Sequence, residues 1–278
     1  MQQVVKDFLA SKELEGKSHG TIENYKMYLE IFEKAMAKEL TEVTTQEIRQ
    51  FLIDYKNEHN VKNITLDNIR RVLNSFYTWS SNNGYIVFNP CAAVAKVKVD
   101  KIKKDGFSEE ELDDIREACK NPRDRAVVEF LYSSGVRISE MVGLNKEDID
   151  WNARRCKVFG KGNKERIVYF SVPAKKRLAE YLESRTDDNP ALFVSLKRPY
   201  DRATKGSIEK SLTVIGDKIN CHVYPHRFRH TCATTLLAKG MPIEEVSKFL
   251  GHEKVETTMI YCTVKDELIE MNYRKIMI

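Results

Sequence analysis

The chain has 278 residues, of which 42% are hydrophobic and 31% are charged. This length suits two domains of ordinary size, and the hydrophobic content excludes a globally disordered chain. No run of about 18 apolar residues is present, so the sequence predicts no membrane-spanning helix. The N-terminus lacks the apolar core of a signal peptide, and we expect a cytoplasmic protein.

The formal net charge is +5. The first hundred residues carry equal numbers of basic and acidic side chains, so the whole excess lies in the C-terminal part. Such an excess permits a polyanionic partner. None of the six cysteines stands in a C-x-x-C pair, which favours reduced thiols in a reducing compartment.

The first hundred residues show helical periodicity. Apolar residues recur at helical spacing in four segments, which open near Val4, Thr21, Thr45 and Thr65. Asn83-Gly84 is a typical helix stop. The sequence therefore predicts a compact four-helix unit over residues 1–97.

A charged stretch follows this unit. Residues 98–106 combine lysines and aspartates with small apolar residues, which indicates an exposed linker, with a short edge strand as the alternative. A second domain is expected over 107–278. Its first helices begin at Ser108 and at Asn121-Pro122, and the second of them ends at Gly135.

The period changes to two between Arg154 and Phe170, where glycines bracket the middle of the segment. This pattern is typical of a β-hairpin with a basic tip. Helical patterns resume from Pro173 and continue to the end. The fold class is therefore predicted as mainly α with a small β-hairpin or sheet, an α+β protein.

Four segments carry side chains suited to chemistry. In the first, Arg137 follows the helix stop at Gly135, and Glu140 lies within helical reach of it. A structural ion pair is the alternative interpretation. In the second, Lys161 stands between two glycines at the hairpin tip, where it can approach a ligand closely. A solvated turn is the alternative.

The third segment is a helix that begins at Pro225. It presents His226 and Arg229 on one face, and a guanidinium near a helix N-terminus suits phosphate oxygens. Five potential zinc ligands also lie close together here: Cys221, His222, His226, His230 and Cys232. A zinc site is disfavoured because two arginines separate the histidines and no zincin glutamate is present.

The fourth segment covers residues 242–261. A short amphipathic helix ends at Gly251, His252 follows it, and a second helix carries Tyr261. This arrangement is compatible with a helix-turn-helix DNA reader. Alternatively, the tyrosine belongs to the core.

In this order and spacing, the segments resemble the tyrosine recombinase, or phage integrase, family, and most closely its compact Xer-like type. The resemblance spans both domains. Its motifs are Arg137 in GVRISE, Lys161 in GKGNKER, His226 and Arg229 in HRFRH, His252 in LGH, and Tyr261 in TTMIY. It implies an N-terminal helical, SAM-like core-binding domain and a C-terminal catalytic domain that together clamp double-stranded DNA.

The resemblance further implies a site-specific recombinase that cuts and rejoins DNA for integration, excision or dimer resolution. Tyr261 would attack the scissile phosphate and form a 3′-phosphotyrosine intermediate, so neither a metal nor a cofactor is expected. Arg137 and Arg229 would hold the phosphate oxygens, and His252 would add a hydrogen bond.

Two roles concern protons. His226 is the candidate general base, because imidazole titrates near neutral pH, and Lys161 is the candidate proton donor to the leaving oxygen. Glu140 would orient the phosphate-binding arginine. The family also implies a homo-tetramer on paired DNA sites, with an accessory protein or a second recombinase as a further partner. The apolar residues of the tail would dock into a neighbouring subunit: Leu268, Ile269, Met271 and Ile276.

Three other functions compete with this interpretation. A non-catalytic DNA-binding regulator would use the 242–261 helix pair, but it leaves Lys161 and both arginines unexplained. A type IB topoisomerase would relax one duplex, whereas a recombinase joins two. A zinc protein would be identified by metal analysis.

Overall fold

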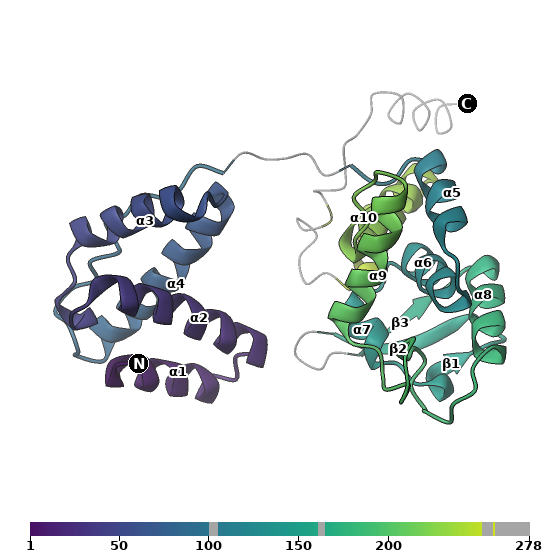
Figure 1. Cartoon of the computed structure of the whole chain (residues 1–278), viewed down its shortest axis with the longest axis horizontal. Helices are drawn as coiled ribbons and strands as arrows, with labels where there is room; N and C mark the ends of the chain where they lie inside the picture. The colour runs from purple at the N-terminus through teal and green to yellow at the C-terminus, as the bar shows by residue number, and fades with distance from the viewer. Residues whose placement is uncertain (100–104, 161–164, 252–257, 259–278) are drawn as a thin grey trace. The chain divides into compact units, whose positions relative to one another are not determined.

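A computed structural model describes residues 1–99, 105–160, 165–251 and 258 (Figure 1). The chain divides into two compact units, Met1–Ile102 and Lys103–Ile278. The limits predicted for the two domains and their linker stay a prediction, since most of residues 98–106 lies outside the described part. None of the helices in that part combines the length and the apolar character that a membrane span requires.

The first unit is helical, as the sequence predicts. Its elements are α1 (Gln3–Leu14), α2 (His19–Met36), a 3-10 turn η1 (Leu40–Glu42), α3 (Thr45–His59) and α4 (Asn63–Asn82). One aromatic cluster organises its core, in which the Phe8 ring contacts three other rings edge-on at centroid distances of 5.2–5.6 Å: Tyr25, Phe76 and Trp79.

Two predicted helix starts in this unit are wrong. The helix expected to open near Thr21 begins at His19, and the one expected near Thr65 begins at Asn63. At neither start does the N-cap side chain accept a hydrogen bond from a backbone N–H of the first turn, so the usual capping signal is missing. By contrast, the third helix has a full capping box between Thr44 and Glu47.

The second unit combines helices with a small sheet. Its helices are α5 (Glu109–Ala118), α6 (Pro122–Ser134), α7 (Ile138–Gly143), η2 (Lys146–Asp148), α8 (Val172–Glu183), α9 (Lys205–Lys218), α10 (Pro225–Ala238) and α11 (Ile243–Leu250). Its strands are β1 (Ile149–Asp150), β2 (Arg155–Phe159) and β3 (Glu165–Tyr169). They form an antiparallel sheet in the order β1-β2-β3.

The predicted hairpin is present as β2 and β3, paired from Arg155 opposite Tyr169 to Phe159 opposite Glu165. The strand β1 was not predicted. This strand pairs only Ile149 with Cys156 and Asp150 with Arg155, and two residues are too few to show an alternating pattern.

Helix α6 is central to the second unit. It packs against both α8 and α10, and it buries apolar side chains on several sides: Ala126, Val127, Val128, Phe130 and Leu131. A helix enclosed in this way is held firmly by its neighbours. The packing around α6 therefore also holds its C-terminal end in place, where Gly135 and Arg137 follow.

Candidate active site

Arg137 stands at the junction between α6 and α7. Gly135 ends α6 in the left-handed region, with φ of 57°, and a Cβ there would lie 2.8 Å from Cδ2 of Leu250. Only glycine meets both conditions without strain. The close approach brings the end of α11 against the residue that precedes Val136 and Arg137.

Glu140 holds Arg137 in two ways. Its Oε2 accepts a hydrogen bond of 2.8 Å from the Arg137 backbone N–H, and its Oε1 accepts one of 2.9 Å from Nη1 of the same residue. The Glu140 carboxylate is buried, whereas the Arg137 side chain remains 31% exposed. The pairing expected from the sequence is therefore present, and the arginine keeps a solvent-accessible face.

A third member of this cluster, Arg166, was not predicted. It lies on β3, and its Nη2 donates a hydrogen bond of 2.6 Å to Oε2 of Glu140. In β3, Arg166 shares the inward face with Val168. A charged residue at an inward position of an alternating strand was the available signal.

Arg229 lies on α10 and is 2% exposed. Its Nη1 donates to the backbone oxygen of Gly135 and its Nη2 to that of Leu250, both at 2.6 Å. On the same helix, Phe228 and Cys232 are buried, so the interior that encloses Arg229 is largely apolar. A guanidinium charge in this interior has a strong local field, because little water screens it.

The three arginines converge on the C-terminal end of α11. Three successive carbonyls at this end each accept a hydrogen bond from a different arginine. Phe249 and Leu250, the last two residues of α11, accept from Arg166 at 2.9 Å and from Arg229 at 2.6 Å, and the capping residue Gly251 accepts from Arg137 at 3.1 Å. Carbonyls at a helix C-terminus carry partial negative charge and lack intrahelical partners. The end of α11 is thus the element that gathers these cations into one place.

Of the other predicted site residues, only His226 lies in the described part of the chain. His226 is exposed near the start of α10, on the same helix as Arg229. Lys161, His252 and Tyr261 lie outside the described residues. The structure therefore brings together Arg137, Glu140 and Arg229, and the remaining assignments stay predictions.

Two of the cysteines considered for zinc, Cys221 and Cys232, have other surroundings. In the part of the chain that the structure describes, no three His, Cys, Asp or Glu side chains form a group that could hold a metal ion. Cys221 contacts Glu111 at 3.3 Å and Arg227 at 3.2 Å. Burial raises the pKa of the Cys232 thiol to about 12, which disfavours the thiolate that a metal requires.

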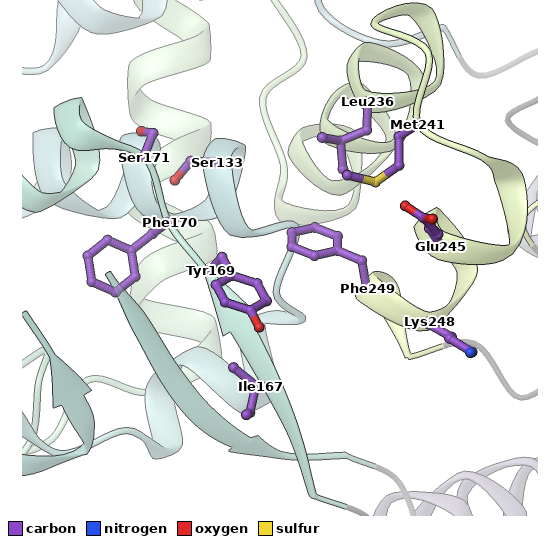
Figure 2. A pocket seen from close by; sticks show the side chains of 10 residues that line it. All are labelled: Ser133, Ile167, Tyr169, Phe170, Ser171, Leu236, Met241, Glu245, Lys248 and Phe249. Carbon is purple, nitrogen blue, oxygen red and sulfur yellow. The ribbon is translucent and has the colours of Figure 1, made fainter. Parts of the chain in front are cut away.

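An apolar pocket of about 630 Å³ lies beside this cluster. It is lined by Ser133, Ile167, Tyr169, Phe170, Ser171, Leu236, Met241, Glu245, Lys248 and Phe249. Figure 2 shows that these side chains come from the end of α6, from β3 and the two residues after it, from the end of α10 and the loop that follows, and from α11. Ile167 is 45% and Tyr169 51% exposed, so the pocket presents large apolar side chains to solvent.

Models of known families match both units. The model described as "Phage integrase family" matches residues 106–267, and "Phage integrase, N-terminal SAM-like domain" matches residues 4–85. Among curated proteins, tyrosine recombinase XerC of Corynebacterium glutamicum is 30% identical over 94% of this chain and 86% of its own length. XerC of Haemophilus influenzae is 34% identical over 87% and 85%, respectively.

Solved structures give the same picture. The XerA recombinase is 27% identical, with a TM-score of 0.56 over 99% of this chain and 98% of its own. The Tn1549 transposon integrase in complex with a circular intermediate DNA has a TM-score of 0.79 at 17% identity, over 99% of this chain and 100% of its own. At that identity, the likeness to the Tn1549 protein concerns the fold.

Proposed function

Since this chain belongs to the phage integrase family, as a site-specific tyrosine recombinase of the Xer-like type, we propose that Tyr261 is the nucleophile of its reaction. The substrate is double-stranded DNA carrying the recombination site. The domain limits that we propose are a core-binding domain at 1–97, a linker at 98–106 and a catalytic domain at 107–278. The enzyme acts in the cytoplasm.

The reaction is a phosphoryl transfer that conserves the energy of the phosphodiester. The phenol oxygen of Tyr261 attacks the scissile phosphorus, the bond from phosphorus to the 5′-oxygen breaks, and a 3′-phosphotyrosine remains. In the second half, a 5′-hydroxyl of the partner strand attacks the phosphotyrosine and releases the phenol. No net bond energy is lost, so the reaction does not require ATP.

The observation that carries the proposal is the convergence of Arg137 and Arg229 at the end of α11. Arg137 donates to the Gly251 carbonyl, and His252 is the next residue in the chain. This supports a phosphate site in which the two arginines and His252 face the non-bridging oxygens. Loss of one preorganised donor of this kind costs about 2.7–4 kcal/mol of transition-state stabilisation.

Two proton transfers complete the mechanism. A tyrosine phenol in water has a pKa near ~10, so a base must take its proton at neutral pH, and we assign this role to His226. Its exposed position on α10 leaves it open to substrate. Lys161 gives a proton to the leaving 5′-oxygen, and Glu140 orients Arg137.

The first test is covalent capture on a nicked suicide substrate. Wild-type protein should form an SDS-stable adduct with the DNA, and Tyr261→Phe should bind the same DNA without forming one. Tyr200→Phe, in the loop before α9, serves as the matched control and should form the adduct normally. An adduct formed by Tyr261→Phe would remove this residue from its role.

The second test concerns Lys161. Lys161→Ala should slow cleavage of ordinary DNA, because the 5′-oxygen leaves poorly without a proton. A substrate with sulfur at the leaving position needs little protonation and should recover much of the rate. Equal slowing on both substrates would contradict the assignment of Lys161 as the acid.

The proposed assembly is a tetramer on two paired sites, with an accessory protein or a second recombinase as a further partner. We assign the apolar pocket beside α11 as the acceptor for the C-terminal tail of a neighbouring copy. The tail carries Leu268, Ile269, Met271 and Ile276, which match the apolar lining. The exposed side chains of Ile167 and Tyr169 support this assignment, since their burial would favour the assembly.

A pair of substitutions tests the acceptor role. Tyr169→Glu should abolish assembly of paired sites while leaving binding of one copy to a half-site intact. Val214→Glu, a comparably exposed position on α9 outside this pocket, should assemble normally. A mixing experiment then shows where the tail docks: one copy lacks the tail but has an intact pocket, and the other keeps the tail but carries Tyr169→Glu. If the two copies assemble on paired sites, the tail docks between subunits. If they do not assemble, the tail docks within its own chain.

A further inference from the structure

Arg166 occupies an unusual position for a charged side chain. Its side chain is 12% exposed, and burial lowers the pKa of its guanidinium. Its Nε is buried and has no hydrogen-bond partner among the described residues. Burial of a charge together with an unsatisfied N–H costs stability. Arg166 is therefore poorly explained as a residue kept for stability alone.

Its two remaining nitrogens connect distant parts of the active site. Nη2 donates to Glu140 at 2.6 Å, and Nη1 donates to the Phe249 carbonyl at 2.9 Å, across 83 positions of sequence. One side chain thus joins β3, which follows the Lys161 segment in sequence, to the carboxylate that holds Arg137 and to the end of α11. A planar guanidinium is suited to this double contact.

Gly251 leaves room for this contact. A Cβ on Gly251 would lie 2.5 Å from Cδ and 2.6 Å from Nε of Arg166. The backbone that leads to His252 therefore passes directly over the Arg166 side chain, and any residue other than glycine would displace one of them.

Arg137, Glu140 and Arg166 form a cluster of two positive charges and one negative charge. The Glu140 carboxylate is 2% exposed and lies between the guanidinium groups of Arg137 and Arg166, so the trio carries one net positive charge. Without Arg166, the carboxylate would neutralise Arg137, and its negative charge would face an incoming phosphate. Because the Glu140 carboxylate is buried, solvent screens its charge only weakly.

We propose that Arg166 is a positioning residue for strand cleavage, which offsets the charge of Glu140 so that Arg137 remains effectively cationic toward the scissile phosphate. Arg166 does not touch the substrate. It acts through Glu140, and it also fixes the end of α11 through the Phe249 carbonyl. This inference rests on the proposed role of Arg137 as a phosphate ligand.

The test compares three variants by single-turnover cleavage at saturating protein, with DNA affinity and melting temperature measured separately. Arg166→Gln keeps an N–H donor but removes the charge, and cleavage should slow on the order of 10- to 100-fold, as for other groups that orient a ligand. Arg166→Lys keeps the charge and should cleave faster than Arg166→Gln. DNA affinity should change little in either variant.

The double variant Glu140→Gln/Arg166→Gln is decisive. It restores the net charge of the trio, so it should cleave faster than Arg166→Gln alone, although Glu140 is altered as well. A purely structural role for Arg166 predicts the reverse, since a second buried substitution would add to the damage. A double variant no faster than the single one would overturn the proposal, as would Arg166→Gln cleaving at the wild-type rate.

Controls separate the possible failures. Arg155→Met removes an arginine from β2 at the end of the hairpin opposite the tip, and should leave cleavage unchanged. If Arg166→Gln does not fold, the test relies on Arg166→Lys and the double variant, because both keep the net charge of the trio. If these two variants fold but do not cleave, the charge argument is contradicted. Tyr261→Phe is run in parallel: an adduct from it defeats the proposed nucleophile, whereas a wild-type rate in Arg166→Gln defeats only this inference.

Discussion

Nη2 of Arg229 donates a hydrogen bond of 2.6 Å to the backbone oxygen of Leu250, 21 residues further along the chain. Leu250 is the last residue of α11, and Arg229 lies in the second turn of α10. The bond therefore ties the helix that carries His226 to the helix that precedes His252. Two motifs separated in sequence are joined by one buried side chain.

Replacement of Arg229 by lysine should cost both stability and cleavage. An ammonium group cannot reach the Gly135 and Leu250 carbonyls with the same planar geometry, and a buried acceptor left without a partner costs about 1–3 kcal/mol. We expect a lower free energy of unfolding in urea and slower adduct formation at saturating protein. Arg125→Lys is the matched control, since Arg125 is exposed. Wild-type stability and rate in Arg229→Lys would show that the two bonds contribute nothing.

Gly251→Ala should combine two penalties. The residue has φ of 66°, which costs a non-glycine residue of the order of 1–3 kcal/mol, and its Cβ would overlap Arg166. Both stability and the cleavage rate should therefore fall, because a displaced Arg166 no longer holds Glu140.

Two other glycines separate these penalties. Gly240 has φ of 90° with no atom within 4 Å of an added Cβ, and Gly143 has neither feature. Gly240→Ala should lose stability without losing cleavage at saturating protein, and Gly143→Ala should lose little of either. If Gly251→Ala behaves like Gly240→Ala in both measurements, the overlap with Arg166 has no catalytic consequence.

Alkaline pH should weaken the second unit through its buried thiols. Burial raises the pKa of Cys119, Cys156 and Cys232 to about 12 each. A raised pKa gives stability that is complete below the unfolded value, near ~8.5, and is lost as the pH rises toward the folded value. The free energy of unfolding should fall between pH 8.5 and 12, as measured by denaturant titration.

A single substitution isolates one thiol. In Cys156→Ala, the decline between pH 8 and pH 10 should be smaller than in wild type by about 1–2 kcal/mol, because one fewer group ionises on unfolding. The comparison uses the change with pH, so the cost of the cavity cancels. Parallel curves for the two proteins would contradict the contribution of Cys156.

The features predicted correctly from sequence are those with local causes. Ser108 caps α5 and Asn121-Pro122 opens α6, because a side chain accepts a hydrogen bond from the backbone within three residues. Gly135 ends α6 for an equally local reason, its positive φ. The hairpin was predicted correctly because each strand has five residues, which is enough to show an alternating pattern.

The features that were missed depend on distant partners. In the sequence, nothing distinguishes the role of Arg166 from that of the other basic residues around it. That role depends on its contacts with Glu140 and with the Phe249 carbonyl, which only the fold brings together. The burial of Arg229 was missed for the same reason, since its acceptors lie on two other segments. Spacing can show which residues are candidates, but the sharing of one carboxylate by two arginines is a tertiary property.

Arg227, the other arginine of HRFRH, should prove structural. Its Nη2 lies 2.8 Å from both oxygens of Glu111, and its guanidinium lies 4.1 Å from the centre of the Phe107 ring. Arg227→Met should lower the free energy of unfolding at pH 7 by about 1–3 kcal/mol, with cleavage at saturating protein little changed. Strong loss of cleavage in a stably folded variant would instead place Arg227 in the reaction.

The pH dependence of this loss identifies the ion pair as its source. Burial pushes the pKa of Glu111 upward, but hydrogen bonds from the Ser108 backbone and from Arg227 outweigh it, and the net pKa lies below the ordinary 4.5. A lowered pKa gives stability that is present above the unfolded value and is lost as the pH falls through the folded one. The gap in unfolding free energy between wild type and Arg227→Met should therefore narrow below pH 4.5 in a denaturant titration. A gap that stays constant down to pH 3 would assign the stabilisation to packing of Arg227 on Phe107 and not to its pairing with Glu111.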